Sequence, residues 1–198
     1  MTVIAAARGL LVRCHAARLV RDTRGMAATE FAIILPLMLM IFFGTIQVST
    51  GVAVDRKVTL LTRTLSDLIS QASSVTDTDL SNTFAISGAM MTPYASTPVQ
   101  AKISQIYIDP STLVAKVKWS KASNATPRSC NEVVAIPAGI AVGGTYLIMS
   151  EVTYNYKPVV GYNIATSFVS PTFALSERTF TRPRQSSSVT YSTAPACT

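Results

Sequence analysis

The chain has few of the residues from which catalytic and metal sites are built. Histidine occurs once in 198 residues, as His15, and charged residues make up only 14% of the sequence. The chain beyond residue 25 therefore has no histidine for a Ser-His-Asp or Cys-His pair, or for a histidine metal site. Asp77 and Asp79 are a close acidic pair, but no further oxygen ligands are arranged around them for calcium. We expect no enzymatic activity, no cofactor and no metal.

Charge is absent from one long stretch, Phe31 to Val54. A helix from Met26 to Val54 would be about 43 Å long at 1.5 Å per residue, which is enough to cross a hydrocarbon core of about 30 Å. No other segment is apolar for long enough to span a bilayer. The sequence therefore predicts one transmembrane helix over residues 26–54. Pro36 predicts a kink or a loosened turn within it, because proline lacks a backbone donor.

Positive charge is concentrated before this helix. Five arginines and one aspartate precede Gly25 and account for more than half of the net charge of +7. The positive-inside rule places the N-terminus in the cytoplasm and residues from about 55 onward on the other side. The remaining basic residues form no stripe interleaved with aromatics, so we expect no nucleic-acid partner. The arginines are Arg8, Arg13, Arg18, Arg21 and Arg24, and the aspartate is Asp22.

One carboxylate, Glu30, stands at the start of the apolar run, in the segment Arg24-Gly25-Met26-Ala27-Ala28-Thr29-Glu30-Phe31. Burying a charge unpaired near lipid is costly, so Glu30 needs a reason to be there. The segment resembles the type IV prepilin signal, in which a basic leader ends in glycine and the fifth and sixth mature residues are glutamate and an aromatic. The resemblance implies that a prepilin peptidase cuts between Gly25 and Met26. Glycine suits such a site because, without a Cβ, its backbone can approach a protease closely.

The same resemblance gives Glu30 a role in assembly. Cleavage would leave a cationic amine on Met26, and Glu30 would pair with that amine in its own or a neighbouring subunit. Phe31, the sixth mature residue, belongs to the same assembly segment. The alternative is an uncleaved signal anchor in which Glu30 lies at the level of the lipid headgroups.

The apolar run is also similar to the N-terminus of one particular family. The strings Glu30-Phe31-Ala32-Ile33-Ile34-Leu35-Pro36-Leu37-Met38-Leu39 and Phe42-Phe43-Gly44 resemble the beginning of TadE-like proteins. These are the minor pseudopilins of the tight-adherence (Flp, type IVc) pilus system. Residues 152–158 and 182–184 resemble features of TadE-like ectodomains more weakly, because those segments are short and ordinary in composition.

This family resemblance implies a function. A TadE-like protein would be a minor pseudopilin that helps to assemble a Tad pilus as an initiator, tip or base component, and so serves adhesion and biofilm formation. Its partners would be the prepilin peptidase, other minor pseudopilins, the major Flp-type pilin, the inner-membrane assembly platform and membrane lipid. It would lie in the bacterial inner membrane as a single-pass protein with a periplasmic C-terminal domain, and incorporation into the pilus would follow. The competing hypothesis is an uncleaved bitopic protein whose ectodomain binds envelope partners.

The helical period continues past the membrane. Apolar residues recur at steps of three and four, which predicts that the helix runs on to about Ala72. Polar residues then break the pattern, and Asp77 or Asp79 is expected to cap a second short helix that ends near Met91. The recurring apolar residues are Val58, Leu61, Leu65, Leu68 and Ile69.

From Val99 the period changes to two. Residues 103–108 and 113–119 flank a turn and predict a hairpin with one apolar face, which carries Leu113, Ala115, Val117 and Trp119. Further strands are expected over residues 145–157 and 172–181.

We therefore expect an α+β fold. A long N-terminal transmembrane helix would extend into a periplasmic domain with a small antiparallel sheet of about four strands. The parts would be a basic cytoplasmic leader (1–25), the transmembrane helix (26–54), a helical neck (55–98) and a β-rich periplasmic domain (99–198).

The three cysteines divide between compartments. Cys14 lies in the leader and would stay in the reducing cytoplasm, whereas Cys130 and Cys197 lie in the expected periplasmic domain, where disulfides persist. We predict that these two pair, as the C-terminal cysteines of many type IV pilins do. In the chain-entropy model, closing a loop of this size stabilises a fold by about 4 kcal/mol. Two free or separately reacting thiols are the alternative.

Overall fold

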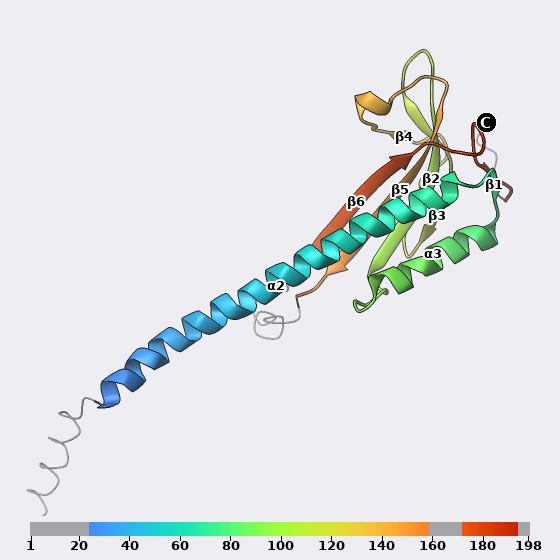
Figure 1. Cartoon of the computed structure of the whole chain (residues 1–198). Helices are drawn as coiled ribbons and strands as arrows, with labels where there is room; N and C mark the ends of the chain where they lie inside the picture. The colour runs from blue at the N-terminus through green and yellow to red at the C-terminus, as the bar shows by residue number, and fades with distance from the viewer. Residues whose placement is uncertain (1–23, 159–171, 194–198) are drawn as a thin grey trace, which may run out of the picture. The chain divides into compact units, whose positions relative to one another are not determined.

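The structure, a computed structural model, describes residues 24–158 and 172–193. The chain forms two compact units, residues 1–46 and 47–198, and helix α2 (Arg24–Ser70) contributes to both. The second unit also contains helix α3 (Asp77–Met91), a five-stranded sheet and a pair of short strands (Figure 1). The fold is of the α+β class, as the sequence predicts.

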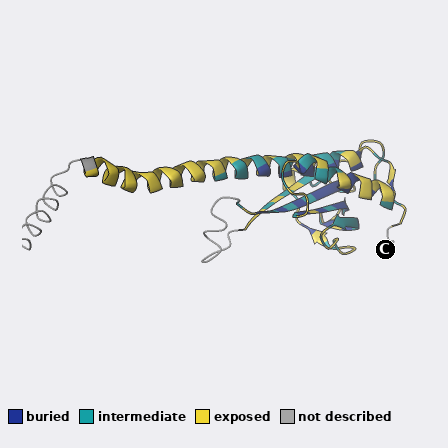
Figure 2. Cartoon of the chain, turned by 90° about the horizontal axis from the view of Figure 1, so that it is seen from below, coloured by how far each residue is buried: buried dark blue, intermediate teal, exposed yellow. Residues whose placement is uncertain are grey.

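In the first unit, α2 exposes its side chains on every side. All residues from Gly25 to Ile46 are exposed (Figure 2). Within the described parts of the chain, α2 is the only helix that is long and apolar enough to cross a membrane. It remains helical through Pro36. The expected apolar helix is therefore present, and its length and composition suggest a single-pass membrane protein.

In the second unit, α2 buries one face. Leu68, which the sequence pattern placed on that face, is 37% exposed. The buried arc extends instead towards three small polar residues, Thr62, Ser66 and Ser70, and at 100° per residue Leu68 falls just outside its opposite edge. The helix ends at Ser70, close to the expected end at Ala72. The buried apolar residues of α2 are Val54, Val58, Leu61, Leu65 and Ile69.

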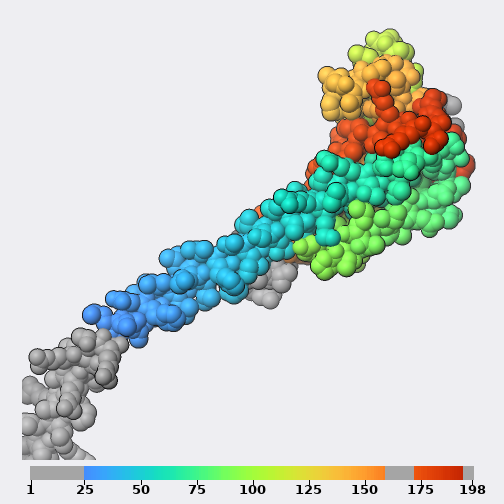
Figure 3. All heavy atoms as spheres, in the orientation of Figure 1, coloured from blue at the N-terminus to red at the C-terminus, as the bar shows by residue number. Residues whose placement is uncertain are grey.

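Helix α3 lies alongside the second half of α2 (Figure 3). Its N-cap is Thr76, rather than Asp77 or Asp79 as the sequence suggested. Thr76 and Asp79 form a capping box, because the Thr76 hydroxyl accepts from the Asp79 backbone while the Asp79 carboxylate accepts from the Thr76 backbone at 2.9 Å. At the other end, Lys57 Nζ donates to the carbonyl oxygens of Met90 and Thr92 at 3.0 and 2.8 Å. This lysine satisfies carbonyls that the last turn leaves without partners.

The sheet has five antiparallel strands, rather than about four, in the order β4-β3-β2-β5-β6. The additional strand, β4, pairs through only two residues, which is too short to show a period in the sequence. The strands are β2 (Val99–Ile108), β3 (Ala115–Ser123), β4 (Val133–Val134), β5 (Tyr146–Tyr156) and β6 (Phe173–Thr181), and a short 3-10 helix, η1 (Ala138–Ile140), lies between β4 and β5.

The prediction that the hairpin has a single apolar face is wrong at β3. Gln105 pairs with Trp119 and Ile106 pairs with Val117, so Lys118 is an extra residue that forms a bulge. The bulge sends Val117 to one face of the sheet and Trp119 to the other. Leu113 precedes the strand, with a positive φ of 56°, and is 50% exposed.

Both faces of the sheet are therefore partly buried. One face packs against α2 and α3 and forms the larger core, which includes Ile103, Trp119, Ile148 and Val152. The other face carries a smaller core around Ile106, Val117, Leu147 and Met149, next to η1.

The last described segment returns to the end of α2. Strand β7 (Thr190–Tyr191) pairs in parallel with β1 (Ser74–Val75), which lies between the two helices in the sequence. The indole Nε1 of Trp119 donates to the carbonyl oxygen of Val189 at 2.9 Å, and Val189 is fully buried. Residues far apart in the sequence thus close one end of the larger core.

Candidate processing and assembly segment

The segment predicted for processing, Gly25 to Phe31, forms the first turns of α2. A Cβ built on Gly25 would meet no heavy atom within 4 Å. The Thr29 hydroxyl donates a hydrogen bond to the carbonyl oxygen of Met26 at 2.8 Å. Packing of the described residues therefore does not require glycine at position 25.

Glu30 makes no hydrogen bond or ion pair with any other residue that the structure describes. Its neighbours Met26 and Phe31 are 61% and 62% exposed. A carboxylate beside a long apolar surface is costly to bury alone. Any partner of Glu30 must therefore come from outside the described residues.

The apolar side chains that follow Glu30 point outward around the whole helix. Ile33, Met38 and Met40 are 77%, 61% and 72% exposed, and the rings of Phe42 and Phe43 meet edge to face at 5.4 Å. Contiguous apolar surfaces of this kind mark contacts with membrane or protein. The first unit is therefore a surface that needs lipid or other subunits around it.

In the second unit, by contrast, an acidic residue has several partners. Glu151 accepts two hydrogen bonds from Arg128, at 2.7 and 2.8 Å, and one from Arg178 at 2.9 Å. Burial raises the pKa of Glu151, but the hydrogen bond from Arg128 and the charges of both arginines outweigh burial, so the pKa is lowered. Arg128 also pairs with Glu132. This network holds the loop after β3, which carries Arg128 and Glu132, against Glu151 on strand β5.

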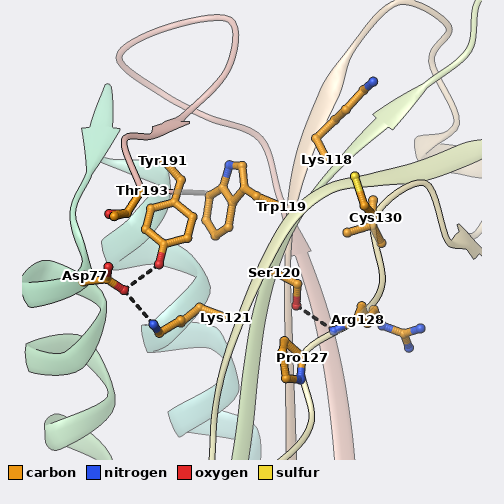
Figure 4. A pocket seen from close by; sticks show the side chains of 11 residues that line it. Asp77, Lys118, Trp119, Ser120, Lys121, Pro127, Arg128, Cys130, Tyr191 and Thr193 are labelled. Carbon is orange, nitrogen blue, oxygen red and sulfur yellow. Dashed lines mark hydrogen bonds and ion pairs between the residues drawn. The ribbon is translucent and has the colours of Figure 1, made fainter. Parts of the chain in front are cut away.

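A cavity of about 390 Å³ lies beside β3 and the N-terminus of α3 (Figure 4). On one side of it, Asp77 accepts hydrogen bonds from Lys121 Nζ and the Tyr191 hydroxyl, both at 2.6 Å. The bonds from Lys121, Tyr191 and Thr193, in that order, lower the pKa of Asp77 to about 2. The ring of Tyr191 meets Trp119 edge to face at 5.4 Å.

This cluster joins α3, β3 and β7. Sequence analysis missed it because Asp77, Lys121 and Tyr191 are far apart in the chain and share no motif. The polar groups of Asp77 are occupied by groups of the same chain, so the arrangement is suited to tying three elements together.

The predicted cysteine pair is only partly within the described structure. Cys130 is exposed in the loop after β3 and lines the same cavity as Thr193. Cys197 lies outside the described residues, as do Cys14 and His15. The pairing of Cys130 with Cys197 therefore stays a prediction. Within residues 24–158 and 172–193, no group of three or more His, Cys, Asp or Glu side chains is arranged to hold a metal ion.

Comparison with known families identifies a match at the N-terminal helix. Residues 25–64 match the model of the family described as TadE-like protein. No curated protein and no solved structure matches the chain. The matched segment begins at Gly25 and covers the apolar half of α2 and most of its buried half. Over these residues the chain is similar to TadE-like proteins, a family associated with the Tad pilus system.

Proposed function

We propose that this protein is a minor pseudopilin of a Tad (Flp, type IVc) pilus. A prepilin peptidase removes residues 1–25, and the mature protein, beginning at Met26, acts as an initiator, tip or base component in pilus assembly. The observation that carries the proposal is the match to the TadE-like family, which starts at the residue on which the expected cleavage depends.

The location of Gly25 supports processing at this bond. Gly25 and Met26 lie in the first turn of α2, so a protease that binds an extended backbone must first unwind that turn. Glycine weakens a helix by about 1 kcal/mol relative to alanine, because its unfolded backbone is freer. The residue thus favours both unwinding and close approach of the enzyme.

Glu30 is exposed and has no partner among the described residues, which supports assembly through the new N-terminus. Cleavage creates an amine on Met26, four residues before Glu30 and at the same end of the helix. In an assembled pilus, the carboxylate pairs with this amine of a neighbouring subunit, and the apolar side chains of residues 31–46 pack against other helices. Both requirements match the helix over residues 25–46, where every residue is exposed and no other described segment of the first unit packs against it.

The second unit then lies in the periplasm. The arginine-rich leader stays in the cytoplasm, which fixes this orientation. An oxidising compartment favours the Cys130–Cys197 pair. The role of the domain is contact with other pilus proteins rather than catalysis, and the partners are the major pilin, other minor pseudopilins and the assembly platform.

Replacement of Gly25 by valine tests the processing step. Gly25→Val should block maturation and leave a protein that is heavier by the leader, because the branched side chain hinders the approach of the peptidase. Gly44→Val is the matched control, since a Cβ at either position meets no atom within 4 Å. Intact-mass measurement of both variants, in cells that contain the peptidase, should show the precursor only for Gly25→Val. Equal masses for wild type and both variants would instead favour the uncleaved bitopic protein.

A further inference from the structure

The structure points to an earlier membrane boundary than the sequence does. We propose that the hydrocarbon-spanning segment is Met26–Ile46, and that residues 47–54 lie at the membrane surface as part of a contact between the second unit and lipid headgroups. This inference rests on two parts of the proposed function: the protein spans a membrane, and its second unit lies in the periplasm. The boundary expected at Val54 came from the absence of charge alone.

Residues 47–54 are already engaged in the second unit. The Tyr156 hydroxyl donates a hydrogen bond to Gln47 Oε1 at 3.2 Å. A Cβ on Gly51 would lie 3.9 Å from the Tyr156 ring, and Val54 is fully buried in the larger core. These residues cannot be packed by a folded domain and surrounded by lipid tails on all sides at once.

The neighbouring strand ends also oppose a deeper position. Tyr156 is the last residue of β5 and pairs with Phe173, the first residue of β6. The chain beyond Tyr156 continues into the exposed Lys157. In hydrocarbon the lysine would be costly to bury, and so would any backbone N–H or C=O group that the end of a strand leaves without a partner. Hydrocarbon around residues 47–54 would immerse these groups as well.

The length of the remaining helix agrees with this boundary. A helix over Met26–Ile46 is about 32 Å long, close to a hydrocarbon core of about 30 Å. Extending the span to Val54 would add about 12 Å. The shorter span therefore needs neither a strong tilt nor a thickened bilayer.

The exposed side chains near Gln47 are of the kinds found at a membrane interface. Phe173 is 54% exposed and lies opposite Tyr156, so both side chains share one face of the sheet. Val48 is 68% exposed on α2. Tyr156 itself is buried, so the groups that can meet lipid are the exposed Phe173, Val48 and Lys157. A lysine beside apolar side chains suits the headgroup level, because its stem lies along apolar surface while its ammonium reaches lipid phosphate. The occupant of this surface is therefore the headgroup layer of the same bilayer.

Single cysteines at exposed positions of α2 test the boundary. The variants are Met40→Cys, Val48→Cys, Val52→Cys and Leu60→Cys, whose native side chains are 72%, 68%, 49% and 56% exposed, so burial within the chain does not separate them. Spheroplasts with the full-length protein receive a membrane-impermeant maleimide, and the wild type supplies the background from native cysteines. Because only the thiolate reacts, each unit by which hydrocarbon raises the pKa of a thiol slows labelling about tenfold.

The proposal predicts that Val48→Cys and Val52→Cys label at rates close to that of Leu60→Cys, while Met40→Cys labels at least about tenfold more slowly. Labelling of Leu60→Cys alone would place Val48 and Val52 in hydrocarbon and overturn the earlier boundary, without affecting the proposed function. If Leu60→Cys reacted only after the membrane was permeabilised, the periplasmic placement would be wrong instead. The first result would contradict the headgroup contact, and the second would contradict the side of the membrane on which the proposal places it.

Discussion

Both halves of α2 carry apolar side chains, but the two halves have opposite surroundings. From Gly25 to Ile46 every residue is exposed, and from Phe31 onward this half carries no charge. From Gln47 to Ser70 the helix buries one face, through residues such as Leu61 and Leu65, while charged residues such as Arg63 lie on its exposed surface. A helix that is apolar all round needs partners outside its own chain, whereas an apolar stripe needs a partner within it. One continuous helix therefore serves two purposes.

The largest difference between the two halves should appear when a leucine is shortened. Leu65 is fully buried in the second half, and Leu37 is 58% exposed in the first. Leu65→Ala should lower the free energy of unfolding of the second unit by about 2–5 kcal/mol, because it removes packed atoms and leaves a cavity. Leu37→Ala should leave that free energy unchanged. Urea unfolding of the full-length protein in detergent, followed by the fluorescence of Trp119, measures both.

Trp119 is suitable because it is the only tryptophan in the chain and is 6% exposed in the same core as Leu65. Equal losses in the free energy of unfolding for the two leucine variants would contradict this difference between the two halves. They would mean that the first half of α2 also stabilises the second unit.

A second difference concerns carboxylates. Glu151 is held by Arg128 and Arg178, whereas Glu30 has no partner among the described residues. Glu151→Ala should destabilise the second unit by about 1–3 kcal/mol, between the effects of breaking exposed and buried ion pairs. Glu30→Ala should not change its unfolding and should leave cleavage largely intact. It should instead reduce the number of pili and the co-purification of other pilus subunits.

One outcome would contradict the expected difference between the two carboxylates. Normal pilus number and unchanged co-purification in a Glu30→Ala strain would show that Glu30 is only an interfacial residue. The bitopic alternative would then be favoured.

The smallest expected effect is a pH dependence confined to the second unit. The pKa of Asp77 is lowered from 3.8 to about 2 by hydrogen bonds from Lys121 and Tyr191. A lowered pKa in the folded state stabilises the fold above pH 3.8, and this contribution is lost as the pH falls towards 2. Wild type should therefore be more stable than Asp77→Asn at pH 5, and the two should converge near pH 2. Asn82→Asp, on the exposed face of α3, would control for a general effect of charge.

If the difference between wild type and Asp77→Asn stayed constant from pH 5 to pH 2, the carboxylate charge would not be what holds the cluster. Thermal unfolding at each pH distinguishes these outcomes.

The helices and the longer strands follow from local patterns in the sequence. The apolar period of 3.6 and the capping residues indicate α2 and α3, the period of two indicates β2, and strand-forming residues indicate β5. These signals are local, since each depends on residues within one element. The similarity to TadE-like proteins was also predictable, because the residues that carry it follow one another in the apolar run.

What the sequence did not predict depends on contacts across the fold. The bulge at Lys118 is set by the pairing of β3 with β2, and no alternation within β3 reveals it. Strand β4 is defined by its two partners, Ala115 and Lys116. The Asp77 cluster joins three elements that only the folded chain brings together. The similarity to TadE-like proteins is confined to α2, because the family match ends at residue 64, before the sheet begins.

The most direct test is the N-terminal residue of the protein isolated from cells that assemble Tad pili. In the proposed function, the first half of α2 becomes the N-terminal helix of a pilus subunit. Mass spectrometry of the intact protein and of its N-terminal peptide should therefore find a chain that begins at Met26, with a free amine four residues before Glu30. A chain that still begins at Met1 in those cells would contradict the account.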